Sequence, residues 1–241
     1  MKNARLFGLA MGLFLILGLT QDSFADRRSY VWTYEYQTLP KGMSEIEYYD
    51  TIKVPDTNDP GIKTFEHWLE YEYGVTDHFD LALYQMFKTK DKREEVDTKY
   101  DGTKLRARYR FGEKGQYFLD PLLYVEYKRS AKHHDPHQLE LKVILAKDIG
   151  NFNVAYNEIL NQALESDEIT ESEYALGIKY KLNNWFSFGM ESKGSYLSDK
   201  YYFGPTFSFG FRRFWIATGF VSAMHKRADD LQVRVIAGIP F

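Results

Sequence analysis

The sequence predicts an all-β fold: a transmembrane, antiparallel, up-and-down β-barrel of about twelve strands, with fourteen strands as the alternative. Three observations predict it. The chain opens on a secretory signal, apolar and polar residues alternate along many segments, and aromatic residues make up 17% of a chain that has no cysteine and is polar on average. Alternation is the pattern of strands with one apolar face. Lipid-facing positions that alternate with polar lumen positions give a polar average, so a barrel reconciles the three observations.

Residues 1–25 are predicted to be a signal peptide. Lys2 and Arg5 precede an apolar run at 6–19, and the small residues in 23–25 suit a signal peptidase. A signal anchor is the alternative, but the run is shorter than the ~20 residues that cross a bilayer as a helix. No later stretch of the chain reaches that length without a charge, so the mature chain is expected to have no transmembrane helix.

Long alternating segments predict the strands. Between 65 and 73, Phe, His, Leu and Tyr alternate with a Glu-rich face, and between 104 and 111 an apolar face alternates with Lys and Arg. The strands of a soluble β-sandwich also alternate, and this is the alternative fold. The segments here are longer than the usual strand of about five or six residues. They match the roughly 9–11 residues that cross a membrane as a strand.

Twelve strands follow when the pattern is counted back from the C-terminus, and an even number returns both ends to the periplasm. The predicted strands are 43–54, 64–75, 79–88, 100–111, 119–129, 137–148, 151–160, 172–182, 185–194, 200–211, 213–224 and 230–241. Short polar turns alternate with longer charged loops, as in transmembrane barrels. The predicted long loops are 88–100, 129–137, 161–171 and 225–230. The connection 112–119 is longer than its position predicts.

Residues 26–42 are predicted to be an N-terminal leader segment, followed by the barrel at 43–241. The stretch 29–38 alternates like a strand, and the Leu-Pro-Lys-Gly sequence at 39–42 then predicts a turn. A spanning strand at 29–38 would have to start outside the cell. We therefore expect a periplasmic or lumen-inserted leader, with a fourteen-strand barrel as the alternative.

The last strand places alternating apolar residues, Val233, Val235 and Ile239, before a terminal aromatic residue, Phe241. Together with the signal peptide and the Tyr-rich strands, this resembles Gram-negative outer-membrane β-barrel proteins, as a small porin-like barrel of a poorly characterised subfamily. The stretch YVWTYEYQTLPKGMSEIEYY resembles the opening of such barrels. The resemblance implies a location in the cell outer membrane. It also implies outer-membrane lipid and the barrel assembly machinery as partners, with these C-terminal residues as the assembly signal.

Charged residues at the inward positions of the strands are predicted to line a pore. They are Glu66, Glu70, Glu72, Asp80, Lys104, Arg106, Arg108, Arg110, Glu126, Glu140, Lys142, Lys179, Glu191 and Arg234. Acids that face bases across a small lumen would orient charged solutes, as rings of charge do in channels. This predicts a narrow porin-like channel for small polar or charged solutes. The alternative is a non-conducting structural or adhesive barrel whose lumen is filled by ion pairs.

The three alternating arginines carry the sharpest functional hypothesis. A charge that faces lipid at mid-membrane depth costs roughly 2–4 kcal/mol, so Arg106, Arg108 and Arg110 are expected to point inward. Only Asp80 is an obvious acid on the neighbouring strand. We therefore expect a local excess of positive charge that favours anionic or zwitterionic solutes.

Catalytic, metal and nucleic-acid functions find little support in the sequence. A lipid-cleaving barrel enzyme needs a His and a Ser on one outward face, and His67 has no Ser two residues away, while Ser222 and His225 fall on opposite faces. The sequence HHDPH at 133–137 is the most metal-like cluster, but a solvated loop is the favoured interpretation. We therefore predict no catalytic residue, no metal, no cofactor and no nucleic-acid partner, since phosphate loops and basic faces are absent from the sequence.

Overall fold

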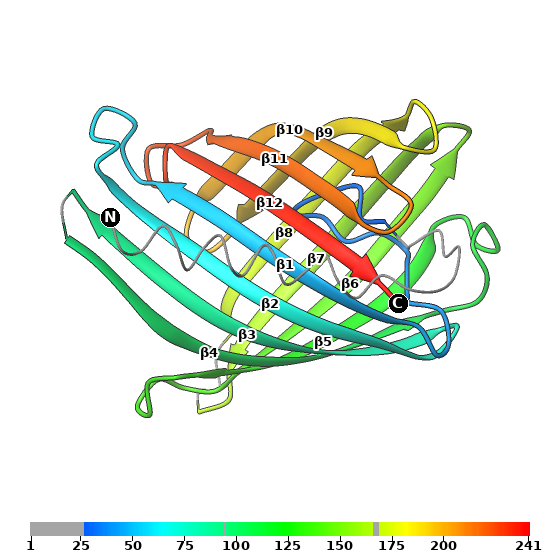
Figure 1. Ribbon diagram of the computed structural model, residues 1–241, viewed down its shortest axis with the longest axis horizontal. Helices are drawn as coiled ribbons and strands as arrows, with labels where there is room; N and C mark the ends of the chain where they lie inside the picture. The colour runs from blue at the N-terminus through cyan, green and yellow to red at the C-terminus, as the bar shows by residue number, and fades with distance from the viewer. Residues whose placement is uncertain (1–26, 94, 166–168) are drawn as a thin grey trace.

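Residues 27–93, 95–165 and 169–241 are described in a computed structural model, and they form a closed barrel of twelve antiparallel strands (Figure 1). The predicted all-β, up-and-down fold is confirmed. The signal peptide predicted for residues 1–25 lies outside the described residues. Within the described part of the chain, no helix is long and apolar enough to cross a bilayer.

The strands follow one another around the barrel in chain order. They are β1 (Ser44–Val54), β2 (Ile62–Thr76), β3 (Phe79–Lys92), β4 (Glu95–Arg110), β5 (Asp120–Ser130), β6 (Gln138–Ile149), β7 (Phe152–Ala163), β8 (Ile169–Lys181), β9 (Phe186–Ser195), β10 (Lys200–Gly210), β11 (Trp215–Ala223) and β12 (Leu231–Pro240). Residues 29–38 form no strand, so the fourteen-strand alternative is wrong.

The barrel closes where β12 pairs with β1. Ile239 lies opposite Ile46 in this register. At the end of the seam, the Phe241 N–H donates to the Ser44 carbonyl at 2.8 Å, and the Ser44 N–H donates back to the Phe241 carbonyl at 2.9 Å. Closure leaves no strand edge unpaired, which is the condition for a sheet to lie in lipid.

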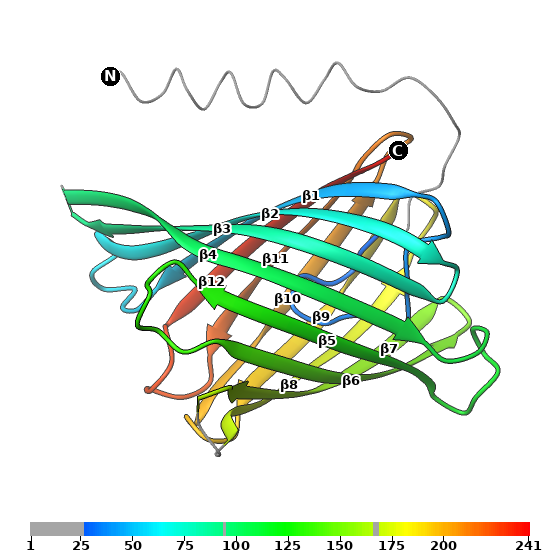
Figure 2. The ribbon, with the colours of Figure 1, turned by 90° about the horizontal axis from the view of Figure 1, so that it is seen from below.

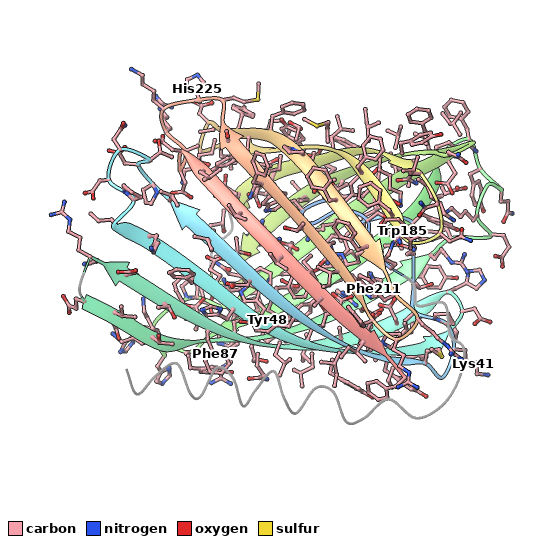
Figure 3. All side chains as sticks on the ribbon, turned by 45° about the horizontal axis from the view of Figure 1, so that its top comes forward. Lys41, Tyr48, Phe87, Trp185, Phe211 and His225 are labelled. Atoms are coloured by element: carbon pink, nitrogen blue, oxygen red, sulfur yellow. The ribbon has the colours of Figure 1, made fainter. Side chains whose placement is uncertain are left out.

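Apolar side chains cover the outside of the barrel (Figure 3). Leu105 is 55% exposed, whereas its chain neighbour Arg106 is 2% exposed, because successive side chains of a strand point to opposite faces. The exposed apolar positions include Leu69, Leu83, Leu141, Val143, Ile178, Phe203, Phe220 and Val235. An apolar outer surface around a charged interior is the reverse of a soluble domain and suits a lipid environment.

The two ends of the barrel differ. We call the end that holds Phe241 the C-terminal end; Lys41 marks it in Figure 3. His225 marks the opposite end, called the loop end. The C-terminal end carries the connections 77–78, 111–119, 150–151, 182–185 and 211–214. The loop end carries the connections 55–61, 131–137, 196–199 and 224–230, and also Arg93, Leu164 and Glu165.

Two of the predicted long loops are in fact strand extensions. The predicted loop 88–100 is wrong, because β3 and β4 continue to pair through most of it and the hydroxyls of Thr89 and Thr98 lie 2.9 Å apart across the pair. The predicted loop 161–171 is likewise shortened by β7 and β8. Beyond the apolar belt both faces of a strand can be polar, so the backbone ladder continues without the alternation that the sequence prediction relied on.

Candidate functional site in the barrel lumen

Residues 27–39, here called the N-terminal segment, lie inside the ring of strands (Figure 2). The segment starts at the C-terminal end, where the Arg27 guanidinium donates to the Asn184 carbonyl at 3.2 Å. It returns to the same end, where the Tyr36 hydroxyl donates to the Gly112 carbonyl at 2.7 Å. The segment is therefore a loop folded into the lumen from one mouth of the barrel.

Glu191 on β9 holds the innermost part of this segment. Its carboxylate accepts hydrogen bonds from three consecutive backbone N–H groups, those of Val31 at 2.9 Å, Trp32 at 2.9 Å and Thr33 at 2.7 Å. An irregular segment has no strand partner for its backbone, so buried N–H groups must find side-chain acceptors. Hydrogen bonds to a charged acceptor are about twice as strong as neutral ones. Glu191 is thus a principal anchor of the segment.

Two further lumen side chains complete the attachment. The Asn157 amide accepts from the Tyr34 N–H at 2.6 Å and donates to the Tyr34 carbonyl at 2.9 Å. It thus makes the two backbone hydrogen bonds that a neighbouring strand would otherwise make. Lys179 makes an ion pair with Glu35. Asn157 on β7, Lys179 on β8 and Glu191 on β9 come from neighbouring strands, so these contacts hold the segment against one part of the barrel wall.

Two glycines make room for the segment in the wall that receives it. A Cβ on Gly177 would lie 2.5 Å from the Tyr30 ring, and a Cβ on Gly219 would lie 2.9 Å from Val31 Cγ2. Both distances are shorter than a van der Waals contact, so a side chain at either glycine would have to displace the segment. The fit is complementary in shape as well as in hydrogen bonding.

The opposite wall carries a buried ion cluster on β2, β3 and β4. Arg106 lies 2.7 Å from Glu70, 2.5 Å from Glu72 and 3.5 Å from Asp80. Arg108 pairs with Asp80 at 2.7 Å and also with Glu72. The expected local excess of positive charge is therefore wrong, since three carboxylates surround these two guanidiniums. The arginine side chains are long enough to reach across β3 to acids on β2.

Aromatic side chains fill the space beside the ion cluster. Tyr49 and Tyr84 are fully buried, with ring centroids 6.2 Å apart. The Tyr49 hydroxyl donates to Glu70 at 2.7 Å and accepts from Arg28 of the N-terminal segment at 2.7 Å. A void of about 20 Å³ remains beside Arg28 and Leu39, roughly the room for one water molecule. The C-terminal half of the lumen is thus packed.

The loop-end half of the lumen is less tightly packed, and we call it the vestibule. The Lys53 and Lys88 side chains are 30% and 34% exposed, whereas the Arg106 side chain is 1% exposed. Lys53 pairs with Glu66 at 2.7 Å. Lys104 pairs with Glu126 at 2.8 Å near the floor of the vestibule, where it borders the packed half. Water can therefore reach the vestibule side chains but not those of the packed half.

The predicted pore-lining residues all lie on the lumen side of the wall, but at different depths. The members with buried side chains in or next to the packed half are Glu70, Glu72, Asp80, Lys104, Arg106, Arg108, Glu126, Lys142 and Glu191. Glu66, Glu140 and Arg234 face the vestibule, Lys179 contacts the N-terminal segment, and Arg110 lies at the C-terminal mouth beside Tyr36. They do not line one open passage.

Sequence reasoning missed the residues that close the lumen. Tyr49, Tyr84 and Tyr124 are each almost fully buried among the charged groups. Their inward direction follows from the same alternation that marked Asp80 and Glu126 as lumen residues. The available signal was therefore the size of these side chains, since large rings at inward positions fill a lumen that smaller residues would leave open.

The outward face carries one polar group that bears on catalysis. His67 Nδ1 lies 3.0 Å from the Tyr48 hydroxyl and 3.2 Å from Asp50 Oδ1. In the described part of the chain, no Ser hydroxyl hydrogen-bonds to His67, so the triad of a barrel lipase is not assembled there. Nor do any three or more described His, Asp or Glu side chains gather in a way that could hold a metal ion.

Comparisons with solved structures return barrels of the same kind. The KdgM porin in complex with oligogalacturonate has a TM-score of 0.55 at 10% identity, covering 82% of this chain and 98% of that one. An outer membrane channel from Pseudomonas putida F1 also has a TM-score of 0.55 at 10% identity, covering 88% and 100% of the two chains. The NanC porin has a TM-score of 0.52 at 10% identity, covering 81% and 98%.

Neither a family model nor a curated protein matches the sequence. At such low identity, the structural likeness shows a shared fold. The chain therefore has the closed β-barrel fold that these porins and channels share.

Proposed function

We propose that the chain is an outer-membrane β-barrel that acts as a narrow, porin-like channel for small polar or charged solutes. The observation that carries this proposal is the vestibule: a charged, partly exposed lumen inside a closed barrel whose outer surface is apolar. Such a lumen lets a hydrated ion or polar solute enter the membrane without contact with lipid. The barrel fold shared with porins supports the same class.

In this proposal the C-terminal end faces the periplasm and the loop end faces the exterior. Residues 1–25 act as the secretory signal, and the barrel assembly machinery reads Val233, Val235, Ile239 and Phe241. Outer-membrane lipid surrounds the apolar belt. Fractionation tests this directly: the protein is expected with the outer membrane, migrating faster unheated than boiled. A folded pool in the soluble periplasm would contradict the location.

Conduction requires the N-terminal segment to move. In the present conformation the segment and the ion cluster around Arg106 fill the C-terminal half of the lumen. This packing also favours the second candidate, a structural or adhesive barrel that conducts nothing. The two candidates differ first in the full chain, because only a channel lets the segment leave the lumen. Removal of the segment then tests whether the ion cluster on the wall blocks the passage without it.

Planar-bilayer conductance decides between them. We would compare the full chain with a variant that lacks residues 27–41 and confirm that both are folded by their heat-dependent migration. A channel predicts brief openings of the full chain and a larger, steadier conductance of the shortened one. A folded shortened barrel that never conducts would favour the structural candidate.

No catalytic activity is part of the proposal. His67 has an acid and a phenol beside it on the outward face, but it lacks a neighbouring serine, and the chain contains no cysteine. A nucleophile next to the base is the minimum for covalent hydrolysis.

A further inference from the structure

Two cations of the barrel wall converge on one aromatic ring of the N-terminal segment. Lys193 Nζ lies 5.2 Å from the centre of the Trp32 ring, and the Arg234 guanidinium carbon lies 5.7 Å from the same centre. Lys193 belongs to β9 and Arg234 to β12, so the two side chains approach each other over β10 and β11. They meet at the floor of the vestibule, above the packed half of the lumen.

The partners of these two cations are all neutral. Lys193 Nζ donates to Gln232 Oε1 at 2.7 Å. Arg234 donates to Thr51 Oγ1 at 2.8 Å and to the Val31 carbonyl at 3.1 Å. Over residues 27–93, 95–165 and 169–241, no carboxylate oxygen lies within the 4.0 Å of an ion pair from either cation. A charge removed from water without a counter-charge is costly, so this pair of cations is electrostatically incomplete.

Three other lumen cations do not share this condition. Lys53, Lys104 and Lys142 each lie within 2.8 Å of a carboxylate oxygen. The carboxylates that face Lys193 are Glu66 and Glu173. Both are engaged elsewhere, Glu66 by Lys53 at 2.7 Å and Glu173 by the Asn161 amide at 3.1 Å.

The floor also has more hydrogen-bond donors than acceptors. Trp32 Nε1 is buried, and it finds no acceptor among the described residues. An indole N–H can only donate, so it stays without a hydrogen bond unless an acceptor atom approaches it. The floor thus offers an ammonium, a guanidinium and a free indole N–H around one ring, and it lacks the anion that would complete them.

We propose that Lys193 and Arg234 form an anion-binding site on the vestibule floor, above Trp32, for a small organic carboxylate. The planar guanidinium matches the two oxygens of a carboxylate, and the ammonium adds a point charge. The Trp32 ring, 8% exposed, lies beneath both cations and closes the floor of the site. The site rests on the proposed channel function, since it places a solute midway along the lumen.

Calorimetric titration of the full-length barrel in detergent tests the site without any need for conduction. The probe is glucuronate, with glucose as its uncharged counterpart and inorganic phosphate as an anion without a carboxylate. Lys193→Gln and Arg234→Gln are each expected to weaken glucuronate binding by about tenfold, the usual cost of one charge-assisted contact. Glucose is expected not to bind, and phosphate is expected to bind more weakly than glucuronate.

The matched control is Lys88→Gln, which removes one positive charge from the same vestibule at a lysine that already lies 3.7 Å from Glu66. It is expected to change binding less than twofold. Arg234→Lys keeps the charge, so it separates the effect of the guanidinium from the effect of the charge. Heat-dependent migration confirms that each variant is folded. No glucuronate binding, equal loss in the Lys88 variant, or phosphate binding as tight as glucuronate binding would each overturn the proposal.

Because binding is measured apart from conductance, failure of the site and failure of the channel give different results. A barrel that binds glucuronate but never conducts keeps the site and removes the channel. A barrel that conducts but does not bind glucuronate removes the site alone.

Discussion

The Glu191 carboxylate on β9 accepts a hydrogen bond from the Thr33 backbone N–H at 2.7 Å, across 158 positions of sequence. The same carboxylate also accepts from the two preceding N–H groups. One side chain of the wall thus fixes a whole turn of the N-terminal segment. In the proposed channel, opening of the lumen would depend on how firmly that carboxylate holds the segment.

Replacing Glu191 with Gln is expected to loosen the N-terminal segment. The amide keeps the size of the side chain but loses the charge. Its NH₂ group is a donor, so it cannot accept hydrogen bonds from the backbone N–H groups. Loss of charge-assisted hydrogen bonds costs about 1–3 kcal/mol. In single-channel recordings this shifts the closed-to-open ratio by roughly tenfold or more towards the open state.

Glu173→Gln is the control for that experiment, because Glu173 also faces the lumen but bonds to Asn161 rather than to the segment. The closed-to-open ratio of the Glu173→Gln variant is expected to equal that of the parent chain. If both variants open equally, the charge of the lumen rather than the anchor controls the opening.

A side chain at Gly177 is expected to displace Tyr30 and open the lumen. The new Cβ of Gly177→Ala would meet the Tyr30 ring at 2.5 Å, so the ring must move. The conductance of the folded Gly177→Ala barrel should be higher than that of the parent. In a chain that also carries Tyr30→Ala, the Gly177→Ala substitution should no longer raise the conductance. Additive effects of the two substitutions would show that the residues do not act on each other.

Arg106→Met is expected to destabilise the barrel strongly. Removal of the guanidinium leaves Glu70 buried without its cation and leaves Glu72 with Arg108 alone, and breaking a buried pair in this way costs about 3–5 kcal/mol. Urea unfolding of the barrel in lipid vesicles measures the loss. The comparison is Lys88→Met, whose partly exposed pairs are worth about 0–1 kcal/mol; equal stabilities of the two variants would be at odds with the cluster as a structural element.

Phe241→Asp is expected to lower the amount of folded barrel in the outer membrane. The substitution keeps the two backbone hydrogen bonds to Ser44 but replaces the ring with a carboxylate, so a control must carry the same new charge at the same end of the barrel. Heat-dependent migration of the membrane fraction measures the folded amount. Phe211→Asp, at another exposed aromatic of the same end, should leave it unchanged; normal assembly of the Phe241 variant would remove this residue from the assembly signal.

The sequence by itself determined the strands and the direction of their side chains. The order of twelve strands, the outward Leu105 and the inward Arg106 all follow from alternation, because a pleated strand turns successive side chains to opposite faces whatever it pairs with. The limits of β3 and β4 escaped prediction, since strands beyond the apolar belt lose the alternation that marks them.

Only the tertiary structure decided what the lumen holds. Arg106 finds Glu72 across an intervening strand, and Trp32 meets Lys193 and Arg234 from distant strands, because closure of the barrel brings them within reach of one another. Sequence alternation left the leader either in the periplasm or in the lumen. Its place was decided by Glu191, Asn157 and the glycine at 177, whose combined fit to the segment exists only after the barrel has closed.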